Sequence, residues 1–237
     1  MMSRRPRLPG LLLALALSGA LGSGLAAEPA PFSRAENLVF VDRHLANLKP
    51  PTALRYDYVK SGALEPGFSD SVRIDVSRSG KACCSVKGRF LSGERAVELP
   101  AVDNAEANPV ILYFLERDIR EMARLTARKT GNYFRNRIRR AMVDEAQVRD
   151  TTVAWQGKAL PAQEVTLTPY ESDPARSRYE RYAKKTYTFV LAPGVPGGVF
   201  QIRTTMAGSQ AGDPATMIDE VMSLVGTEAA PTASTPR

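Results

Sequence analysis

The stretch that decides the fold is "NPVILYFLERDIREMARLTARKTGNYFRNRIRRAM", residues 108–142. Asn108 is a suitable N-cap, and Pro109 stands at the first helical position, where the missing N–H of proline costs nothing. An apolar stripe then recurs at helical spacing through Ile111, Leu115, Ile119, Met122 and Thr126. Residues 130–132, "TGN", break the pattern, and a second helix carries Phe134, Ile138, Ala141 and Met142 on one face. The stretch predicts two amphipathic helices whose apolar faces pack against another element.

The sequences on both sides of the helix pair alternate apolar and polar residues, as half-buried strands do. Before the pair, we predict strands over residues 52–59, 71–77, 82–90 and 95–100. After it, we predict strands over residues 148–155, 162–170, 179–192 and 199–206. Consecutive strands joined by short turns form antiparallel meanders. The order predicts an α+β domain in which one antiparallel sheet, built from two meanders, bends around the inserted helices.

Two further helices are predicted near the ends of this domain. Ser33 and Glu36 form a capping-box pattern that begins a helix over residues 34–48, and Pro50 and Pro51 stop it. A last short helix is expected between a cap at Asp213 and Gly226. We therefore expect a single domain over residues 28–226, followed by a disordered tail, rich in Pro, Ala and Thr, over residues 227–237.

The first 27 residues have the three parts of a secretory signal peptide. Three arginines, Arg4, Arg5 and Arg7, precede an apolar run, and small residues at Ala26 and Ala27 offer cleavage sites. Glycines and serines interrupt the run, whereas a membrane-spanning helix needs about 20 mostly apolar residues. We expect a periplasmic protein of a Gram-negative cell, with no transmembrane span in the mature chain.

Removing the leader lowers the formal net charge from +7 to +4, because 29 basic residues then face 25 acidic ones. A charge of this size permits contact with a membrane surface but does not call for nucleic acid, which an exported protein rarely meets. The two cysteines, Cys83 and Cys84, are adjacent. They are interpreted as one buried and one exposed thiol, with a vicinal disulfide and a soft-metal ligand pair as alternatives. A metal would need further ligands, and the chain has one histidine, His44. No cofactor is expected.

Two sets of residues are candidates for binding. The first is aromatic and would line a groove between the sheet and the helices, although core packing explains each member equally well: Tyr56, Tyr58, Phe114, Tyr133, Phe134, Trp155, Tyr187 and Phe189. The second is basic and occupies residues 124–140, which contain no acidic residue: Arg124, Arg128, Arg135, Arg137, Arg139 and Arg140. These arginines would contact an anion, a lipid headgroup or an envelope protein, or would pair with Glu164, Glu171 or Asp173.

The predicted order resembles the LolA-like group of exported proteins, which includes outer-membrane lipoprotein carriers and related lipid-binding domains. The resemblance covers residues 34–206, and "VPGGVFQIR", residues 195–203, looks like the glycine turn and following strand found late in such chains. It implies an incomplete barrel whose open side is covered by helices, with acyl chains in the apolar space between them. The chain also resembles exported proteobacterial proteins without an assigned role. No binding residue is carried over from either group.

The sequence offers little for catalysis. It lacks the G-x-S-x-G, H-E-x-x-H, P-loop and dinucleotide motifs. A serine-type triad needs a histidine as base, and the one histidine, His44, lies on the predicted first helix, where a lone histidine is more often a surface or packed residue than a catalyst. We therefore expect a non-enzymatic protein that binds a lipid, an acyl chain or another apolar ligand, or the acylated end of a lipoprotein. The alternative is an envelope interaction or scaffold module that uses residues 124–140. A hydrolase is the remote alternative.

Overall fold

A computed structural model of the chain describes residues 31–79, 82–128, 130–208 and 212–229. Its described part contains one antiparallel sheet of nine strands in the order β4-β3-β2-β1-β9-β8-β7-β6-β5. The sheet is strongly curved and does not close into a barrel, because β4 and β5 at its two edges do not pair with each other. The predicted α+β class and the curved sheet of two meanders are confirmed.

The strands of the first meander follow one another directly along the chain, and its four members are β1 (Thr52–Ser61), β2 (Phe68–Ser79), β3 (Ala82–Phe90) and β4 (Val97–Glu98). The second meander follows the helices and consists of β5 (Gln147–Trp155), β6 (Lys158–Leu167), β7 (Thr186–Leu191), β8 (Val199–Ala207) and β9 (Thr216–Glu228). Both meanders pair neighbour with neighbour, including β6 and β7, which are joined by a long connection.

The two meanders are joined at the middle of the sheet by the first and the last strand. β1 pairs antiparallel with β9, with Ala53 opposite Glu228 at one end and Ser61 opposite Asp219 at the other. The register shifts once, between Arg55 and Tyr56. This seam makes a single sheet of segments from opposite ends of the domain.

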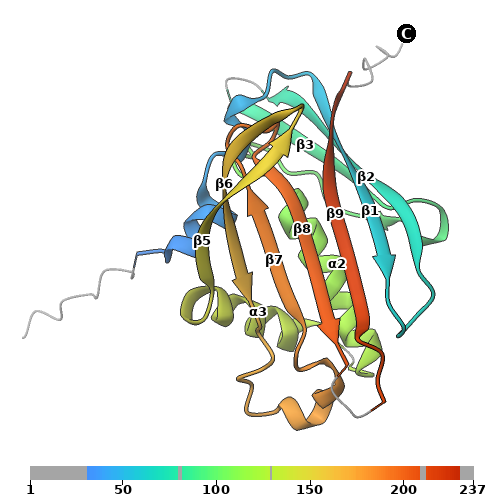
Figure 1. Ribbon diagram of the computed structural model, residues 1–237. Helices are drawn as coiled ribbons and strands as arrows, with labels where there is room; N and C mark the ends of the chain where they lie inside the picture. Colours follow the sequence, from blue (N-terminus) through green and yellow to red (C-terminus); the bar gives the residue numbers. More distant parts are fainter. Residues whose placement is uncertain (1–30, 80–81, 129, 209–211, 230–237) are drawn as a thin grey trace, which may run out of the picture. The chain divides into compact units, whose positions relative to one another are not determined.

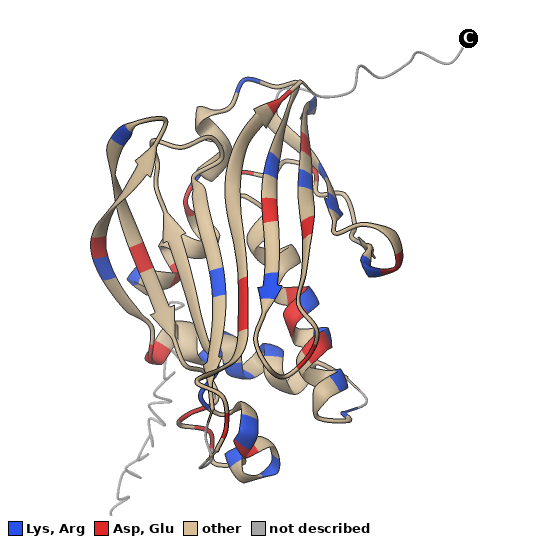
Figure 2. Cartoon of the chain, turned by 45° about the vertical axis from the view of Figure 1, so that its right-hand side comes forward, with Lys and Arg blue, Asp and Glu red and all other residues tan. Residues whose placement is uncertain are grey.

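The predicted central helices are α2 (Val110–Leu125) and α3 (Asn132–Asp144). The Asn108 carboxamide oxygen accepts a hydrogen bond from the Val110 N–H at 3.1 Å, so Asn108 does cap α2. Both helices lie on the same face of the sheet (Figure 1). The opposite face carries Lys and Arg interspersed with Asp and Glu along the strands (Figure 2), and cross-strand pairs such as Arg203 with Asp219, at 2.7 Å, lie there. The apolar core therefore lies between the sheet and the helices.

The predicted helix over residues 34–48 is wrong in its length. The capping box of Ser33 and Glu36 is present, but it opens three short pieces: α1 (Arg34–Glu36), a π-helical turn (Asn37–Val41) and a 3₁₀ turn (His44–Asn47). The chain becomes extended at Asp42, and the Leu45 N–H bonds to the Glu106 carbonyl at 3.0 Å instead of to its own helix. A tertiary hydrogen bond thus replaces the helical one at this position.

The predicted strand over residues 179–192 begins later than expected. Residues Arg176–Tyr182 form a 3₁₀ helix, and β7 starts only at Thr186. The Tyr179 ring is buried against Phe134 and Tyr170, and its hydroxyl donates to Asp173. These side-chain contacts favour a compact turn over an extended strand.

The predicted last helix is wrong, because residues 216–228 form the long strand β9 in the centre of the sheet. The misleading residue is Glu220, which lies on the buried face between Ile218 and Met222. A charged residue at that position hides the apolar alternation of the strand and leaves a helix-like spacing. Since β9 extends to Glu228, the domain continues beyond the predicted boundary at residue 226. The predicted leader and residues 230–237 of the tail lie outside the described residues.

The hairpin between β7 and β8 contains the predicted glycine turn and depends on Gly197. Its φ is +71°, and a Cβ there would lie 2.5 Å from Leu54 Cδ1, in the buried core. We expect Gly197→Ala to lower the free energy of unfolding by about 2–4 kcal/mol, because it combines a left-handed backbone with overpacking. Gly157, with φ +75° and no atom within 4 Å of the place a Cβ would occupy, is the matched control, and Gly157→Ala should cost only about 1 kcal/mol. If urea unfolding shows the same loss of unfolding free energy for Gly197→Ala and Gly157→Ala, the packing argument is contradicted.

Candidate functional site: an apolar groove between the helices

A groove of about 760 Å³ lies along the side of α2 that faces away from the sheet. One wall comes from α2 itself, through Ile111, Leu112, Leu115 and Ile119. The facing wall comes from α3 and holds Ile138 and Met142. We call this space the helix groove. The apolar side chains of its two helical walls recur at three- and four-residue spacing, which places them on one face of each helix.

Two segments without long regular structure complete the helix groove. Residues 32–40 contribute Phe32, Val39 and Phe40, and residues 99–109 contribute Leu99, Pro100, Val102 and Ala105. Phe32 is 63% exposed and Leu112 is 55% exposed. Folded proteins rarely leave large apolar side chains this exposed around one concavity without a partner. The helix groove therefore has the composition of a site for an apolar ligand.

The wall formed by residues 99–109 is held in place by hydrogen bonds to distant segments. Val102 exchanges two backbone hydrogen bonds with Val86 of β3, at 2.8 and 2.9 Å, and the Tyr113 hydroxyl donates to the Pro100 carbonyl at 2.9 Å. The Asn108 carboxamide donates to the Gly197 carbonyl at 2.9 Å and to the Tyr56 hydroxyl at 3.0 Å. The wall is thus tied to the sheet and to the β7–β8 hairpin.

The single histidine of the chain supports the same wall from behind through a hydrogen bond with Asn108. His44 Nδ1 accepts a hydrogen bond from the Asn108 N–H at 3.1 Å, and Nε2 lies 2.8 Å from the Leu38 carbonyl, so the ring is neutral with its proton on Nε2. Burial lowers the pKa of His44, although the hydrogen bond to Leu38 and the nearby carboxylate of Asp42 oppose this shift. Both ring nitrogens are therefore committed to backbone groups, which gives His44 a structural role.

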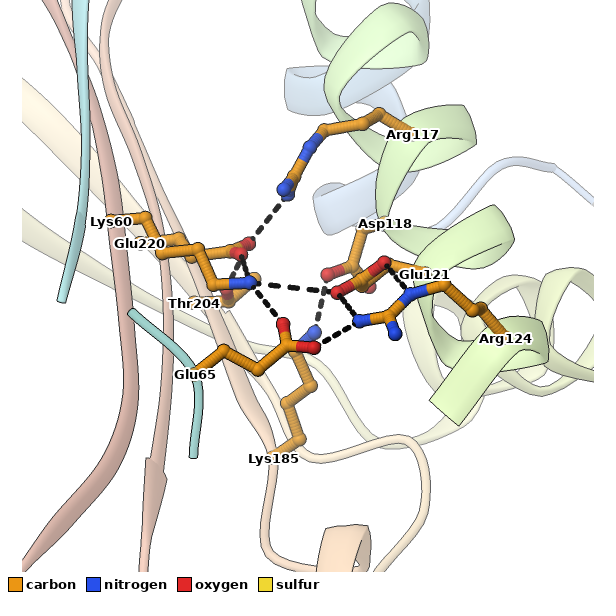
Figure 3. A network of polar contacts seen from close by, with 9 residues as sticks. All are labelled: Lys60, Glu65, Arg117, Asp118, Glu121, Arg124, Lys185, Thr204 and Glu220. Atoms are coloured by element: carbon orange, nitrogen blue, oxygen red, sulfur yellow. Dashed lines mark hydrogen bonds and ion pairs between the residues drawn. The ribbon is translucent and has the colours of Figure 1, made fainter. Parts of the chain in front are cut away.

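On its other face, α2 is fastened to the sheet by a network of charges (Figure 3). The central anion is Glu220 of β9, which is buried and lies 2.8 Å from Arg117 of α2 and 3.6 Å from Lys60 of β1. Lys60 also contacts Glu65 at 2.7 Å and Glu121 of α2 at 3.5 Å. Arg124 closes the network near the surface through Glu65 and Glu121. Apart from the pair of Arg124 with Glu121 within α2, each of these contacts joins a cation of one segment to a carboxylate of another.

The deepest part of the network joins α2 to the start of β7. Asp118 and Lys185 are both fully buried and form an ion pair. Asp118 also accepts a hydrogen bond from the Tyr187 hydroxyl at 2.5 Å, and the Tyr170 hydroxyl lies 2.9 Å from that of Tyr187. A buried carboxylate held by an ammonium group and a hydroxyl is stable only in this geometry, because each group depends on the others for its solvation.

The network favours the ionised forms of two of its carboxylates, Glu121 and Glu220. The hydrogen bond from Arg124 lowers the pKa of Glu121 to about 2, with Lys60 adding to the effect against burial. Burial alone would raise the pKa of Glu220, but the charges of Lys185, Arg117 and Lys60 outweigh it and lower the pKa instead. Since these cations come from α2, β1 and the start of β7, ionised Glu220 fixes the position of α2 on the sheet, and with it one wall of the helix groove.

None of the eight aromatic residues predicted to line a groove borders the helix groove. Tyr58 and Phe114 pack with Phe90 in the core, while Tyr133, Phe134 and Tyr187 belong to a second aromatic cluster around Tyr170 and Tyr179. Tyr56 and Phe189 are fully buried, and Trp155 contacts Phe200. The eight side chains therefore pack in the space between sheet and helices where the sequence analysis placed a ligand.

The predicted basic surface is mostly engaged within the protein. Arg124 and Arg135 pair with glutamates, and Arg128 lies over the ring of Tyr133 at 4.3 Å. Arg137 is buried and pairs with Asp173 at 3.2 Å. This pair is one of those that the sequence analysis gave as an alternative to ligand binding. Among the described residues, Arg139 and Arg140 have no ion-pair partner. Of the six arginines, Arg135 and Arg139 border the helix groove.

The adjacent cysteines are bonded to each other, so the vicinal-disulfide alternative describes them. Cys83 is exposed and Cys84 is buried, which matches the predicted burial but not the predicted free thiols. The Cys84 carbonyl accepts a hydrogen bond from the Ala105 N–H at 2.9 Å, next to the wall of the helix groove.

The chain matches no protein-family model and no curated protein. The resemblance to LolA-like proteins therefore remains a prediction. Within the described residues, no helix is long and apolar enough to cross a membrane.

Titration of His44 should weaken the domain as the pH falls. The folded state holds the ring neutral, so its folded pKa lies below the unfolded value of 6.5. The stabilisation is complete above the unfolded pKa and is lost as the pH falls through the folded pKa, because a protonated ring cannot accept from Asn108. We expect the free energy of unfolding to fall between about pH 7 and pH 5, and His44→Gln to show a flatter profile over the same range. Parallel profiles would exclude His44 as the cause.

Removing one charge from the deep part of the network should be costly. Lys185→Met leaves Asp118 buried without its counter-ion, and we expect the free energy of unfolding to fall by about 3–5 kcal/mol. Adding Asp118→Asn removes the stranded charge, so the double variant should be more stable than Lys185→Met alone. Arg176 forms an exposed pair with Glu180 at 3.6 Å, and Arg176→Met should change the stability by about 0.5 kcal/mol or less. A loss for Lys185→Met no larger than this control would contradict the role of the network.

Proposed function

We propose that the protein is an exported, non-enzymatic binder of an apolar ligand, and that the helix groove holds an acyl chain of a lipid or of a lipoprotein. The observation that carries this proposal is the exposure of Phe32 and Leu112 on one groove of about 760 Å³ with apolar helical walls. This volume lies within the range of about 300–1,000 Å³ that is usual for small-molecule sites. An acyl chain would cover the apolar side chains that are now in contact with water, at about 0.8 kcal/mol for each methylene group buried.

The position of the proposed ligand differs from that implied by the resemblance to LolA-like proteins. The space between sheet and helices holds the aromatic clusters and the charge network, whereas the helix groove lies beyond α2. Export is supported by the leader pattern of residues 1–27, and a periplasmic location follows from it as part of the proposal.

The interaction module remains a second candidate. It keeps the exposed Arg139 and Arg140 as its contact residues, since most of the other predicted arginines have partners within the domain. The remote alternative is a hydrolase. Both ring nitrogens of His44, the one histidine of the chain, are bonded to backbone groups, so this residue does not support that alternative.

The apolar wall provides the test of ligand binding. The mature chain is titrated with a fluorescent long-chain fatty acid, and organic extracts of the protein purified from the periplasm are analysed for lipid. We expect Leu112→Glu to weaken binding by about tenfold, because it places a charge on the wall that the chain must cover. Thermal unfolding should change little, since the Leu112 side chain is already largely exposed.

Val59 supplies the matched control. It is 44% exposed, but it belongs to β1 and lies on the sheet face opposite the helices. Val59→Glu should therefore bind the probe as the unchanged protein does. Failure of the unchanged protein to bind any acyl probe, together with a lipid-free extract, would remove the acyl-binding function. Equal losses of probe affinity in Leu112→Glu and Val59→Glu would exclude the helix groove as the acyl-binding site.

A further inference from the structure

The charges around the helix groove divide into engaged groups and one free group. Three carboxylates border the groove, and each has a partner. Glu36 accepts a hydrogen bond from the Ser33 N–H at 2.8 Å, and Glu106 pairs with Arg43 at 3.5 Å. Glu116 pairs with Arg120 at 3.3 Å and with Arg135 at 2.8 Å. Arg139 also borders the groove. Within the described residues, its guanidinium group takes part in no ion pair or hydrogen bond.

The position of Arg139 on α3 places it beside the apolar wall. It follows Ile138 directly and precedes Met142 by three residues, and Arg135 lies one helical turn before it. All four side chains border the helix groove, as residues at three- and four-residue spacing on one helix face do. A chain lying on Ile138 and Met142 would thus end within reach of a guanidinium group with unused donors.

We propose that Arg139 selects ligands of one chemical class, single acyl chains that end in an anionic head, by binding that head at the rim of the helix groove. The proposal rests on the function proposed above. Guanidinium groups bind carboxylates and phosphates through two parallel N–H···O bonds, so either head satisfies the geometry. Because the acidic rim residues are already paired, Arg139 is, among the residues that the structure describes, the rim charge that remains for a ligand.

The contribution of Arg139 to ligand affinity is limited by the exposure of its side chain to water. Arg139 is exposed, and ion pairs in water contribute little and are screened by salt. We expect the unchanged protein to bind palmitate about threefold more tightly than methyl palmitate, which has the same chain and no charge. The preference should shrink as the salt concentration rises. Palmitoyl lysophosphatidate, compared with the same methyl ester, tests the phosphate head.

Arg139→Gln is the test variant and Arg140→Gln is its matched control, because Arg140 is the next residue on α3, is exposed and does not border the groove. Arg139→Gln should bind methyl palmitate as the unchanged protein does and lose the preference for palmitate, while Arg140→Gln keeps it. Thermal unfolding of both variants should match that of the unchanged protein.

The outcomes separate this inference from the proposed function. If only Arg139→Gln loses the preference for palmitate over methyl palmitate, Arg139 selects the anionic head. A larger preference for palmitate than for palmitoyl lysophosphatidate, each relative to methyl palmitate, indicates a carboxylate ligand, and the reverse indicates a phosphate ligand. Equal binding of palmitate and methyl palmitate by the unchanged protein, or a preference that survives in Arg139→Gln, overturns the inference and leaves acyl binding intact. Absence of binding to all the acyl probes overturns both.

Discussion

Glu220 is buried between the sheet and α2, and its charge determines how α2 packs on the sheet. A carboxylate in that position is stable only if cations reach it from several elements at once, and Arg117 from α2 and Lys60 from β1 do so. The rotation of α2 is thereby fixed: its charged face meets the sheet, and its opposite face, with Leu112 and Leu115, is left to form the helix groove. α2 therefore buries Val110, Phe114 and Met122 together with these charges, so it packs as an amphipathic helix whose buried side also holds ion pairs.

The same buried charges explain where sequence reasoning succeeded and where it failed. The two meanders and the central helices were predictable, because their apolar periodicity and caps are local signals, as at Asn108. β9 was not, since Glu220 interrupts the alternation that defines a strand, and its cations lie far away in the sequence. Lys60 and Lys185 are buried for the same reason. A sequence window contains no information on such partners, so a paired internal charge is indistinguishable from a solvated one.

The candidate site was predictable only in part. Aromatic residues were expected at a ligand site because they could line a space under the sheet, but large rings fill that space themselves, as Phe134 and Tyr170 do. Residues 99–109 form a wall of the helix groove only because backbone and side-chain hydrogen bonds with Val86, Tyr113 and His44 hold them there. One local signal was available: residues 110–115 are six consecutive apolar residues, more than a helix with a single buried face needs.

The pairing of β1 with β9 has a consequence for the order of events in folding. β1, the first strand, pairs with β9, the last strand of the domain. Until β9 is present, the two meanders stay separate and β1 and β8 each have an unpaired edge. Contacts between distant segments form slowly because a long loop must close before they are gained. If the chain crosses a membrane unfolded, this topology delays completion of the core until β9 has arrived on the far side. The seam would thus help keep the precursor competent for transport as well as joining the two meanders.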